Sequence, residues 1–287
     1  MLVITGATGQ LGRKITQNLL HQVPADSIAV SVRDPAKAAD LERAGVRVRQ
    51  GDYDDAASLR NAWEGAHRLL LVSSNAAASG GDPLPQHATA ITVAKELGVE
   101  RIFYTSQIAS SALSHFPPAL THAATEQMLA KSGLAWTALR HGFYADSALA
   151  MNARGFASGT LAAPADGKVS WTTHDDLAAA DAMLLAGKEI YDGPTPPLTG
   201  SEAFDLTDLA AFAQSILGKP VTRHLLDDEE MLETAEMSGV PAERVAIMMG
   251  YYRAARAGEF AQVDPTLARL IGRRPQLMHD FMAERLS

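Results

Sequence analysis

The sequence contains no cysteine. This absence excludes disulfides, thiolate metal sites and a cysteine nucleophile, and it suits a reducing compartment such as the cytoplasm. The apolar run that begins at Leu2 leaves no room for a signal peptide. No later stretch approaches the roughly 18 uninterrupted apolar residues of a transmembrane helix. We therefore expect a cytoplasmic protein with no membrane span.

Basic charge is also scarce. The 287 residues include 25 Lys and Arg against 33 Asp and Glu, a net charge of −8 with histidine neutral. Because nucleic-acid binding requires clustered cations, we expect no nucleic-acid partner. Apolar residues make up 47% of the chain, which is enough for a large core in one or two domains.

The signatures of two hydrolase classes are missing. The nine histidines include no HExxH spacing, and the chain has no G-x-S-x-G turn. His174, followed by Asp175 and Asp176, is more typical of a helix start than of a metal site. We therefore expect no metal centre.

Short apolar runs alternate with amphipathic segments from Leu2 to about Tyr144. Six of them are typical of strands: LVIT, SIAVSV, VRVRQ, RLLLVS, RIFYTS and AWTALR. This alternation predicts an α/β fold of the Rossmann type, a doubly wound parallel sheet with helices on both faces. Beyond Tyr144 the alternation is lost. We predict a dinucleotide-binding domain over residues 1–150 and a smaller, mainly helical, substrate-side domain over 151–287, some of whose segments return to the sheet.

Three glycines follow the first strand at three-residue spacing, in VITGATGQLG. In a strand-turn-helix context, Gly6 permits the tight turn, Gly9 lets a pyrophosphate approach the backbone, and Gly12 lets the helix pack on the strand. A glycine-rich turn without a ligand is the alternative. The predicted pyrophosphate loop consists of Gly6, Ala7, Thr8, Gly9, Gln10 and Leu11.

The end of the second strand indicates which dinucleotide is bound. Arg33, in VSVRDPAKA, occupies the place where an acidic residue would bind the ribose of NAD. A guanidinium instead matches a 2′-phosphate, so we predict NADP, bound as NADPH. Asp34 and Pro35 are typical of a helix cap and first helical residue. Asp52, in QGDYDD, either meets the adenine edge or forms a turn.

The ends of the fourth and fifth strands supply further polar residues. The carboxyl ends of parallel strands line the ligand crevice of an open sheet. We therefore expect Ser73, Ser74 and Asn75 to lie near the nicotinamide half of the cofactor, and Thr105, with Tyr104 and Ser106, to line the crevice. The apolar segment that follows, QIASSALSHFPPAL, is a candidate lid.

Together these motifs resemble the NmrA-like branch of the atypical short-chain dehydrogenase/reductases, and within it the bacterial NADPH:quinone oxidoreductases and triphenylmethane reductases. The resemblance rests on ITGATGQLG, VRDPAKA, PQHATAITVAKELGV, HAATEQML and LRHGFYADS. It implies that Gly142, Phe143 and Tyr144 border the nicotinamide, with Tyr144 a catalytic candidate. His141 departs from the family, which usually has Asn there, so the substrate side of the pocket differs in detail.

The chain lacks the usual proton-donating pair of short-chain dehydrogenases, because none of its six tyrosines is followed by Lys four residues later. The corresponding helix offers His122 and Glu126. His122 is either a proton donor, since histidine titrates near neutrality, or a helix-start residue bonded to backbone, which Glu126 could also fix. A quinone needs less proton assistance than a ketone. We expect an NADPH-dependent reductase of quinones or similar conjugated acceptors, compatible with a homodimer; the alternative is an NADP(H)-binding redox sensor without turnover.

Overall fold

The computed structural model describes residues 1–287, which divide into two compact units. The first comprises residues 1–106, 121–140 and 174–196, and the second comprises residues 107–120, 141–173 and 197–287. The chain therefore passes between the units several times. A single boundary near residue 150 does not describe this division, because the segment 174–196 contributes a helix and a strand to the first unit.

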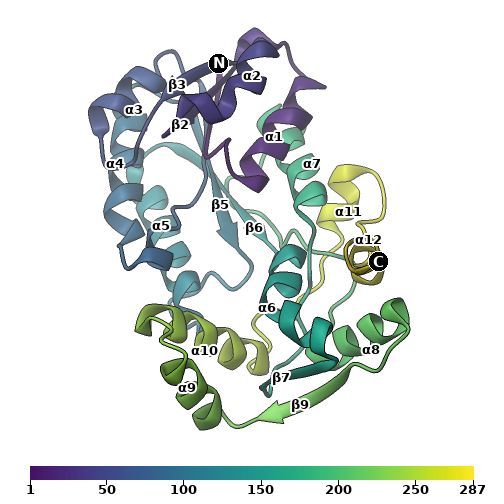
Figure 1. The fold of residues 1–287 in the computed structure, drawn as a ribbon. Coiled ribbons are helices and arrows are strands. Elements are labelled where there is room, and N and C mark those ends of the chain that lie inside the picture. The colour runs from purple at the N-terminus through teal and green to yellow at the C-terminus, as the bar shows by residue number, and fades with distance from the viewer. The chain divides into compact units, whose positions relative to one another are not determined.

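The first unit contains a seven-stranded sheet in the order β3-β2-β1-β4-β5-β6-β8 (Figure 1). Strand β1 pairs in parallel with β2 and β4, β2 with β3, β4 with β5, and β6 with β8. The order reverses between β1 and β4, which confirms the predicted doubly wound Rossmann fold. The strands are β1 (Leu2–Thr5), β2 (Ile28–Val32), β3 (Arg47–Gln50), β4 (Arg68–Leu71), β5 (Arg101–Gln107), β6 (Ala135–His141) and β8 (Gly193–Pro194).

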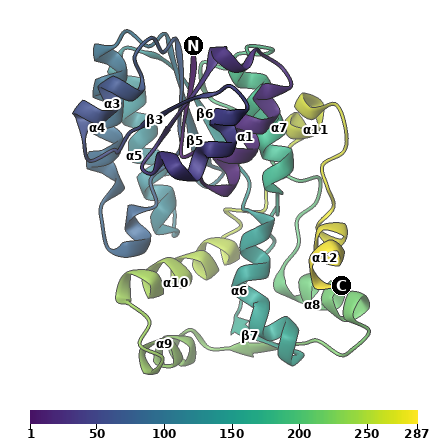
Figure 2. The same cartoon turned by 45° about the horizontal axis from the view of Figure 1, so that its top comes forward.

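Helices cover both faces of this sheet. Figure 2 shows α3, α4 and α5 on one side of the strands and α1 and α7 on the other, and α1 packs along α7. Val3 and Ile4 are fully buried and every residue of β2 is buried, as expected for strands that are covered on both faces. The helices are α1 (Gln10–Leu20), α2 (Ala39–Arg43), α3 (Ala56–Ala62), α4 (Pro83–Glu96), α5 (Pro117–Ser132) and α7 (His174–Leu185), with 3-10 turns η1 (Ala25–Ser27), η2 (Pro35–Ala38) and η3 (Ala76–Ser79).

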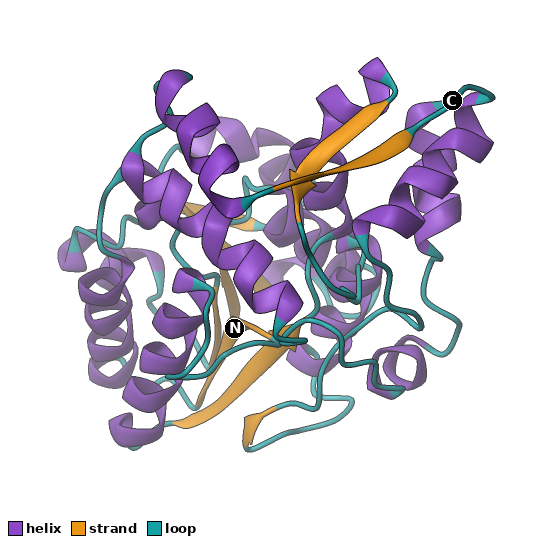
Figure 3. Ribbon diagram, turned by 90° about the horizontal axis from the view of Figure 1, so that it is seen from below, coloured by secondary structure: helices purple, strands orange, loops and turns teal.

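The second unit is mainly helical. Its two strands, β7 (Thr160–Pro164) and β9 (Thr222–Leu226), pair in parallel as a separate two-stranded sheet, visible as an orange pair in Figure 3. Its helices are α6 (Ala145–Ser158), α8 (Leu206–Leu217), α9 (Asp228–Met237), α10 (Ala242–Arg256), α11 (Thr266–Ile271) and α12 (Met278–Leu286). No helix of the protein is both long and apolar enough to cross a bilayer.

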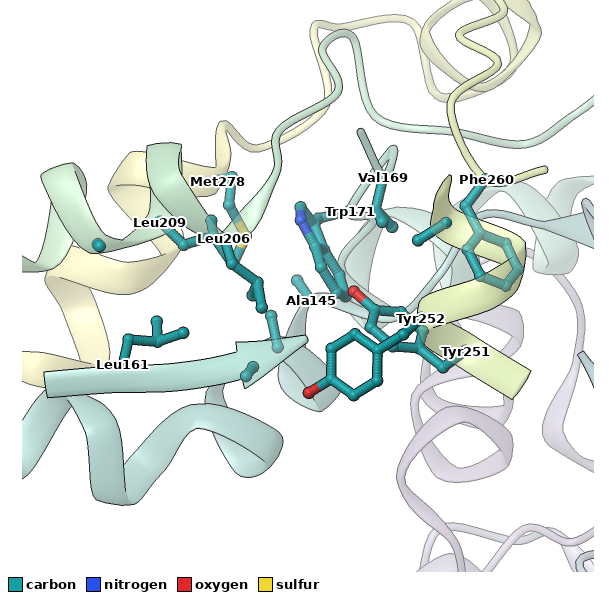
Figure 4. Packing of buried hydrophobic residues seen from close by; sticks show 14 of the residues in the cluster. Ala145, Leu161, Val169, Trp171, Leu206, Leu209, Tyr251, Tyr252, Phe260 and Met278 are labelled. Atoms are coloured by element: carbon teal, nitrogen blue, oxygen red, sulfur yellow. The ribbon is translucent and has the colours of Figure 1, made fainter. Parts of the chain in front are cut away.

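An aromatic cluster forms the core of the second unit. Trp171 lies between Leu206 on one side and Tyr252 on the other (Figure 4). The segment 107–120, expected to be a lid, is anchored in this unit. The backbone N–H of His115 donates to the carboxylate of Glu259 at 2.9 Å, and the rings of Phe116 and Phe260 lie 5.5 Å apart.

Candidate cofactor site

The glycine turn brings the start of α1 against the end of β1. Gly6 has φ of +62°, a conformation that glycine adopts without strain. The N–H of Gly9 donates to the carbonyl of Gly6 at 2.9 Å. A Cβ atom on Gly12 would lie 2.4 Å from that same carbonyl oxygen, so only glycine lets α1 approach so closely. These contacts confirm the predicted roles of Gly6 in the turn and Gly12 in packing.

The N-terminus of α1 is open. Gly9 is its N-cap, no side chain caps it, and its first turn carries no acidic residue. A Cβ on Gly9 would meet only the Gly6 carbonyl oxygen within 4 Å, at 3.3 Å. A side chain at Gly9 would therefore meet less of the protein than one at Gly12, although the Gly6 carbonyl would have to shift slightly. Unpaired N–H groups and the helix dipole favour an anion at such an end.

Only part of the predicted loop is accessible. Thr8, Gly9 and Gln10 are exposed, whereas the side chains of Ala7 and Leu11 are buried in the core. Ala7 and Leu11 therefore anchor the loop, and any contact they make with a ligand is through backbone atoms.

Arg33 follows β2, at the edge of the sheet where the glycine turn lies, and its guanidinium has no ion-pair partner. It is exposed after β2 and makes no ion pair or hydrogen bond. Arg13, by contrast, pairs with Asp40 and donates to the carbonyl of Lys37 at 2.7 Å. Asp34 accepts a hydrogen bond from the N–H of Ala36 at 3.2 Å and caps η2, as predicted.

The residues after β3 form a turn and a clamp. Asp52 accepts from the N–H of Asp54 at 3.1 Å, which is the turn-forming role. The hydroxyl of Tyr53 bonds to Thr5 Oγ1 and donates to the carbonyl of Val72 at 2.8 Å. The N–H of Val72 in turn donates to Thr5 Oγ1 at 2.8 Å. Burial raises the pKa of Tyr53, so its hydroxyl keeps the proton with which it ties the ends of β1 and β4 together.

Two side chains hold the segment after β4. The N–H of Ser73 donates to Thr105 Oγ1 at 2.8 Å, and the N–H of Ser74 donates to His87 Nε2 at 2.9 Å. Asn75 is exposed. Thr105 is only 1% exposed, so it supports this segment from beneath. Sequence reasoning missed His87, because it is fully buried in α4 and does not follow the end of a strand.

The environment of His122 differs from the one expected. Its Nδ1 lies 2.8 Å from the hydroxyl of Tyr104. Glu126 is instead bound by Arg140, at 2.7 Å and 3.2 Å, and by the hydroxyl of Ser106 at 2.6 Å. An arginine fork thus pairs with the Glu126 carboxylate, and the role of His122 stays a prediction.

Three predicted residues belong to the second unit. The N–H of Gly142 donates to the carbonyl of Leu198 at 2.8 Å, and a Cβ there would lie 2.3 Å from Thr172 Oγ1, so packing alone requires glycine. The ring of Phe143 lies 5.0 Å from that of Phe260. Tyr144 is the N-cap residue of α6. Their place beside the nicotinamide stays a prediction.

Comparisons with known proteins agree with this geometry. A family model described as NAD(P)H-binding matches residues 6–180. Quinone oxidoreductase 2 of Escherichia coli is 37% identical over 273 residues, which is 95% of this chain and 94% of that protein. The structure of the NADPH-dependent quinone oxidoreductase from E. coli, complexed with NADPH, matches with a TM-score of 0.91 at 36% identity, covering 100% of both chains. The Citrobacter sp. triphenylmethane reductase complexed with NADP(H) matches with a TM-score of 0.86 at 30% identity, again over 100% of both.

Substitutions at Gly9 and Gly12 should have opposite consequences. Gly9→Ala should fold with nearly unchanged stability and bind NADPH at least tenfold more weakly, because its methyl group enters the space left for the pyrophosphate. Gly12→Ala should lose about 2 kcal/mol of folding free energy, because its methyl group meets backbone. Urea unfolding and fluorescence titration with NADPH measure the two effects. Normal NADPH binding by Gly9→Ala would move the site elsewhere.

Arg33→Ala should weaken NADPH binding by about 1–3 kcal/mol and leave NADH binding nearly unchanged, because only NADPH carries the 2′-phosphate. Arg43→Ala is the matched control, since Arg43 is also exposed and lies on α2. Calorimetric titration of both variants with both cofactors separates a specific contact from a general loss of charge. An equal loss for NADPH and NADH would contradict the assignment.

His87 should make stability depend on pH. Burial lowers the pKa of His87 to about 4, whereas an unfolded chain takes up this proton near 6.5. The unfolded state therefore binds more protons between these values, and the free energy of unfolding should fall by up to about 3 kcal/mol as pH drops from about 6.5 to 4. Urea unfolding of wild type and His87→Gln across this window tests it, and equal slopes would refute it.

Proposed function

The chain belongs to the NAD(P)H-binding family, in its NmrA-like branch, and from this membership we propose that it transfers hydride from NADPH to a quinone or a similar conjugated acceptor. The observation that carries the cofactor assignment is the uncapped N-terminus of α1 behind the glycine turn, with the unpaired Arg33 at the same edge of the sheet. The acceptor is proposed from the similarity, over 95% of the chain, to the E. coli quinone oxidoreductase.

The residues present fit a bound NADPH. The backbone N–H groups of residues 8–11 would bind the pyrophosphate, and Arg33 the 2′-phosphate. Asp52 would meet the adenine, and the segment from Ser73 to Asn75 would lie along the ribose and nicotinamide half. When bound, the cofactor supplies the hydride. The protein's part is to orient the acceptor and exclude water.

Little proton assistance is needed for this acceptor class, because quinone reduction gives an aromatic product with mildly acidic oxygens. His122 is the proposed donor in the first unit. Its Nδ1 is engaged by Tyr104, so a proton passed to the acceptor would leave from Nε2. The hydroxyl of Tyr104 would hold the imidazole ring in orientation. Tyr144 is the second catalytic candidate, by resemblance to the family.

A redox sensor that binds NADP(H) without turnover is the second candidate. The missing tyrosine–lysine pair is compatible with this function, since a protein that only binds the cofactor needs no proton donor, and it is equally compatible with quinone reduction. The two functions share a cofactor site and differ in turnover.

Steady-state NADPH oxidation with a panel of quinones separates them. We expect turnover with wild type, and a lower rate with Gly9→Ala at an NADPH concentration below the wild-type KM. His122→Ala should lower turnover by about a hundredfold for an acceptor that needs protonation, and less for quinones, with little change in NADPH affinity. Tight NADPH binding with no turnover on any acceptor would favour the sensor. Unchanged rates in His122→Ala on two unlike acceptors would remove His122 from the mechanism.

A further inference from the structure

The segment after β4 is attached to the protein through backbone donors. Strand β4 ends at Leu71, and the next residues have left the sheet. The N–H of Ser73 donates to Thr105 Oγ1, and the N–H of Ser74 donates to His87 Nε2. The hydroxyl of Ser74 bonds to Gln86, the neighbour of His87 in α4, and accepts from the N–H of Ala76 at 3.1 Å. Side chains thus replace the missing sheet partner.

The contacts of His87 fix its tautomer. Because Ser74 N–H is a donor, Nε2 must be unprotonated, and the proton of the neutral ring must lie on Nδ1. That proton is donated to Thr125 Oγ1, 2.8 Å away. The hydroxyl of Thr125 donates onward to the carbonyl of Thr121 at 2.9 Å. The hydrogen bonds therefore run from Ser74 through His87 and Thr125 to Thr121. A ring that is protonated on Nε2, whether as the other tautomer or as the imidazolium, cannot accept from Ser74 N–H.

The surroundings of His87 keep the ring neutral. It is fully buried, and the ring of Tyr104 on β5 lies edge-on to it at 5.4 Å. On its own helix, the carboxylate of Asp82 favours the charged form, but burial outweighs this and the pKa of His87 is lowered to about 4. From α5 the contact is the uncharged Thr125, and from the segment after β4 it is Ser74.

We propose that His87 is a positioning residue of the cofactor site: its neutral form, protonated on Nδ1, holds Ser74 and thereby fixes the Ser73–Asn75 segment against which the ribose and nicotinamide half of NADPH binds. This inference rests on the proposed function, because the assignment of that segment to the cofactor gives the contact its purpose. Asn75 is exposed, so the segment has little packing to hold it. Without the contact from His87, the conformational entropy lost on ordering the segment would weaken NADPH binding.

Two amide substitutions separate the two contacts of the ring. In His87→Gln the side-chain oxygen reaches the position of Nε2 and can still accept from Ser74. In His87→Asn the amide reaches only the position of Nδ1 and can still contact Thr125. His87→Gln should bind NADPH within about threefold of wild type. His87→Asn and His87→Leu should bind at least tenfold more weakly, with a raised KM for NADPH and a kcat changed less than threefold at saturating NADPH.

Thermal unfolding of each variant shows whether affinity merely follows stability. Equal affinities of His87→Gln and His87→Asn, or affinities that follow melting temperature alone, would overturn the proposal. Should the variants fail to fold, nitrogen chemical shifts of the wild-type ring decide. They should show Nδ1 protonated and Nε2 bare, with and without NADP+, and the Ser74 amide should shift when NADP+ is added. A ring protonated on Nε2 would overturn the proposal.

The NADPH affinities of these variants are measured by fluorescence titration without an acceptor. They are therefore independent of the reductase assay. Affinity that depends on His87, in a protein that oxidises no NADPH with any quinone, would refute the proposed activity and leave this inference standing. If His87→Asn reduces quinones with the wild-type KM for NADPH, the proposed activity stands and the role of His87 is refuted.

Discussion

The seating of α1 on the end of β1 is the contact on which the candidate site depends. It is possible only because Gly12 has no side chain, since a Cβ there would lie 2.4 Å from the Gly6 carbonyl oxygen. The contact places the N-terminus of α1, without a cap, at the edge where the parallel strands end. At Gly9 the constraint from packing is weaker, because a Cβ there would lie 3.3 Å from the same oxygen. Packing therefore requires glycine at position 12 and restricts position 9 much less.

Hydrogen bonds from side chains to backbone then fix the rest of that edge. Beyond the last sheet pairing, backbone groups need other partners, and a buried group without one costs about 1–3 kcal/mol. Tyr53 and Thr5 supply them at Val72, Thr105 at Ser73, and His87 at Ser74. A site whose walls are fixed by hydrogen bonds within the protein loses less entropy when a ligand binds.

Local sequence patterns predicted local structure well. Each of the six apolar runs became a strand within two residues of its expected ends, and Asp34 became a cap, because burial periodicity and capping act over a few residues. Partnerships across the chain were not predictable. His87 and Thr125 are 38 positions apart, and the capture of Glu126 by Arg140 depends on how α5 meets β6. The sequence predicted that segments beyond residue 150 return to the sheet but did not identify residues 174–196 as one of them, since β8 has only two residues.

The charge balance around His122 bears on the acceptor. Glu126 is 7% exposed, and its charge is met by the guanidinium of Arg140. The Tyr104 hydroxyl meets His122 without a lysine four residues on, the arrangement that would make a tyrosine acidic enough to protonate an alkoxide. Such an arrangement suits an acceptor whose reduced form is itself stable as an anion, as a hydroquinone is, better than it suits a ketone, whose alkoxide must be protonated as it forms.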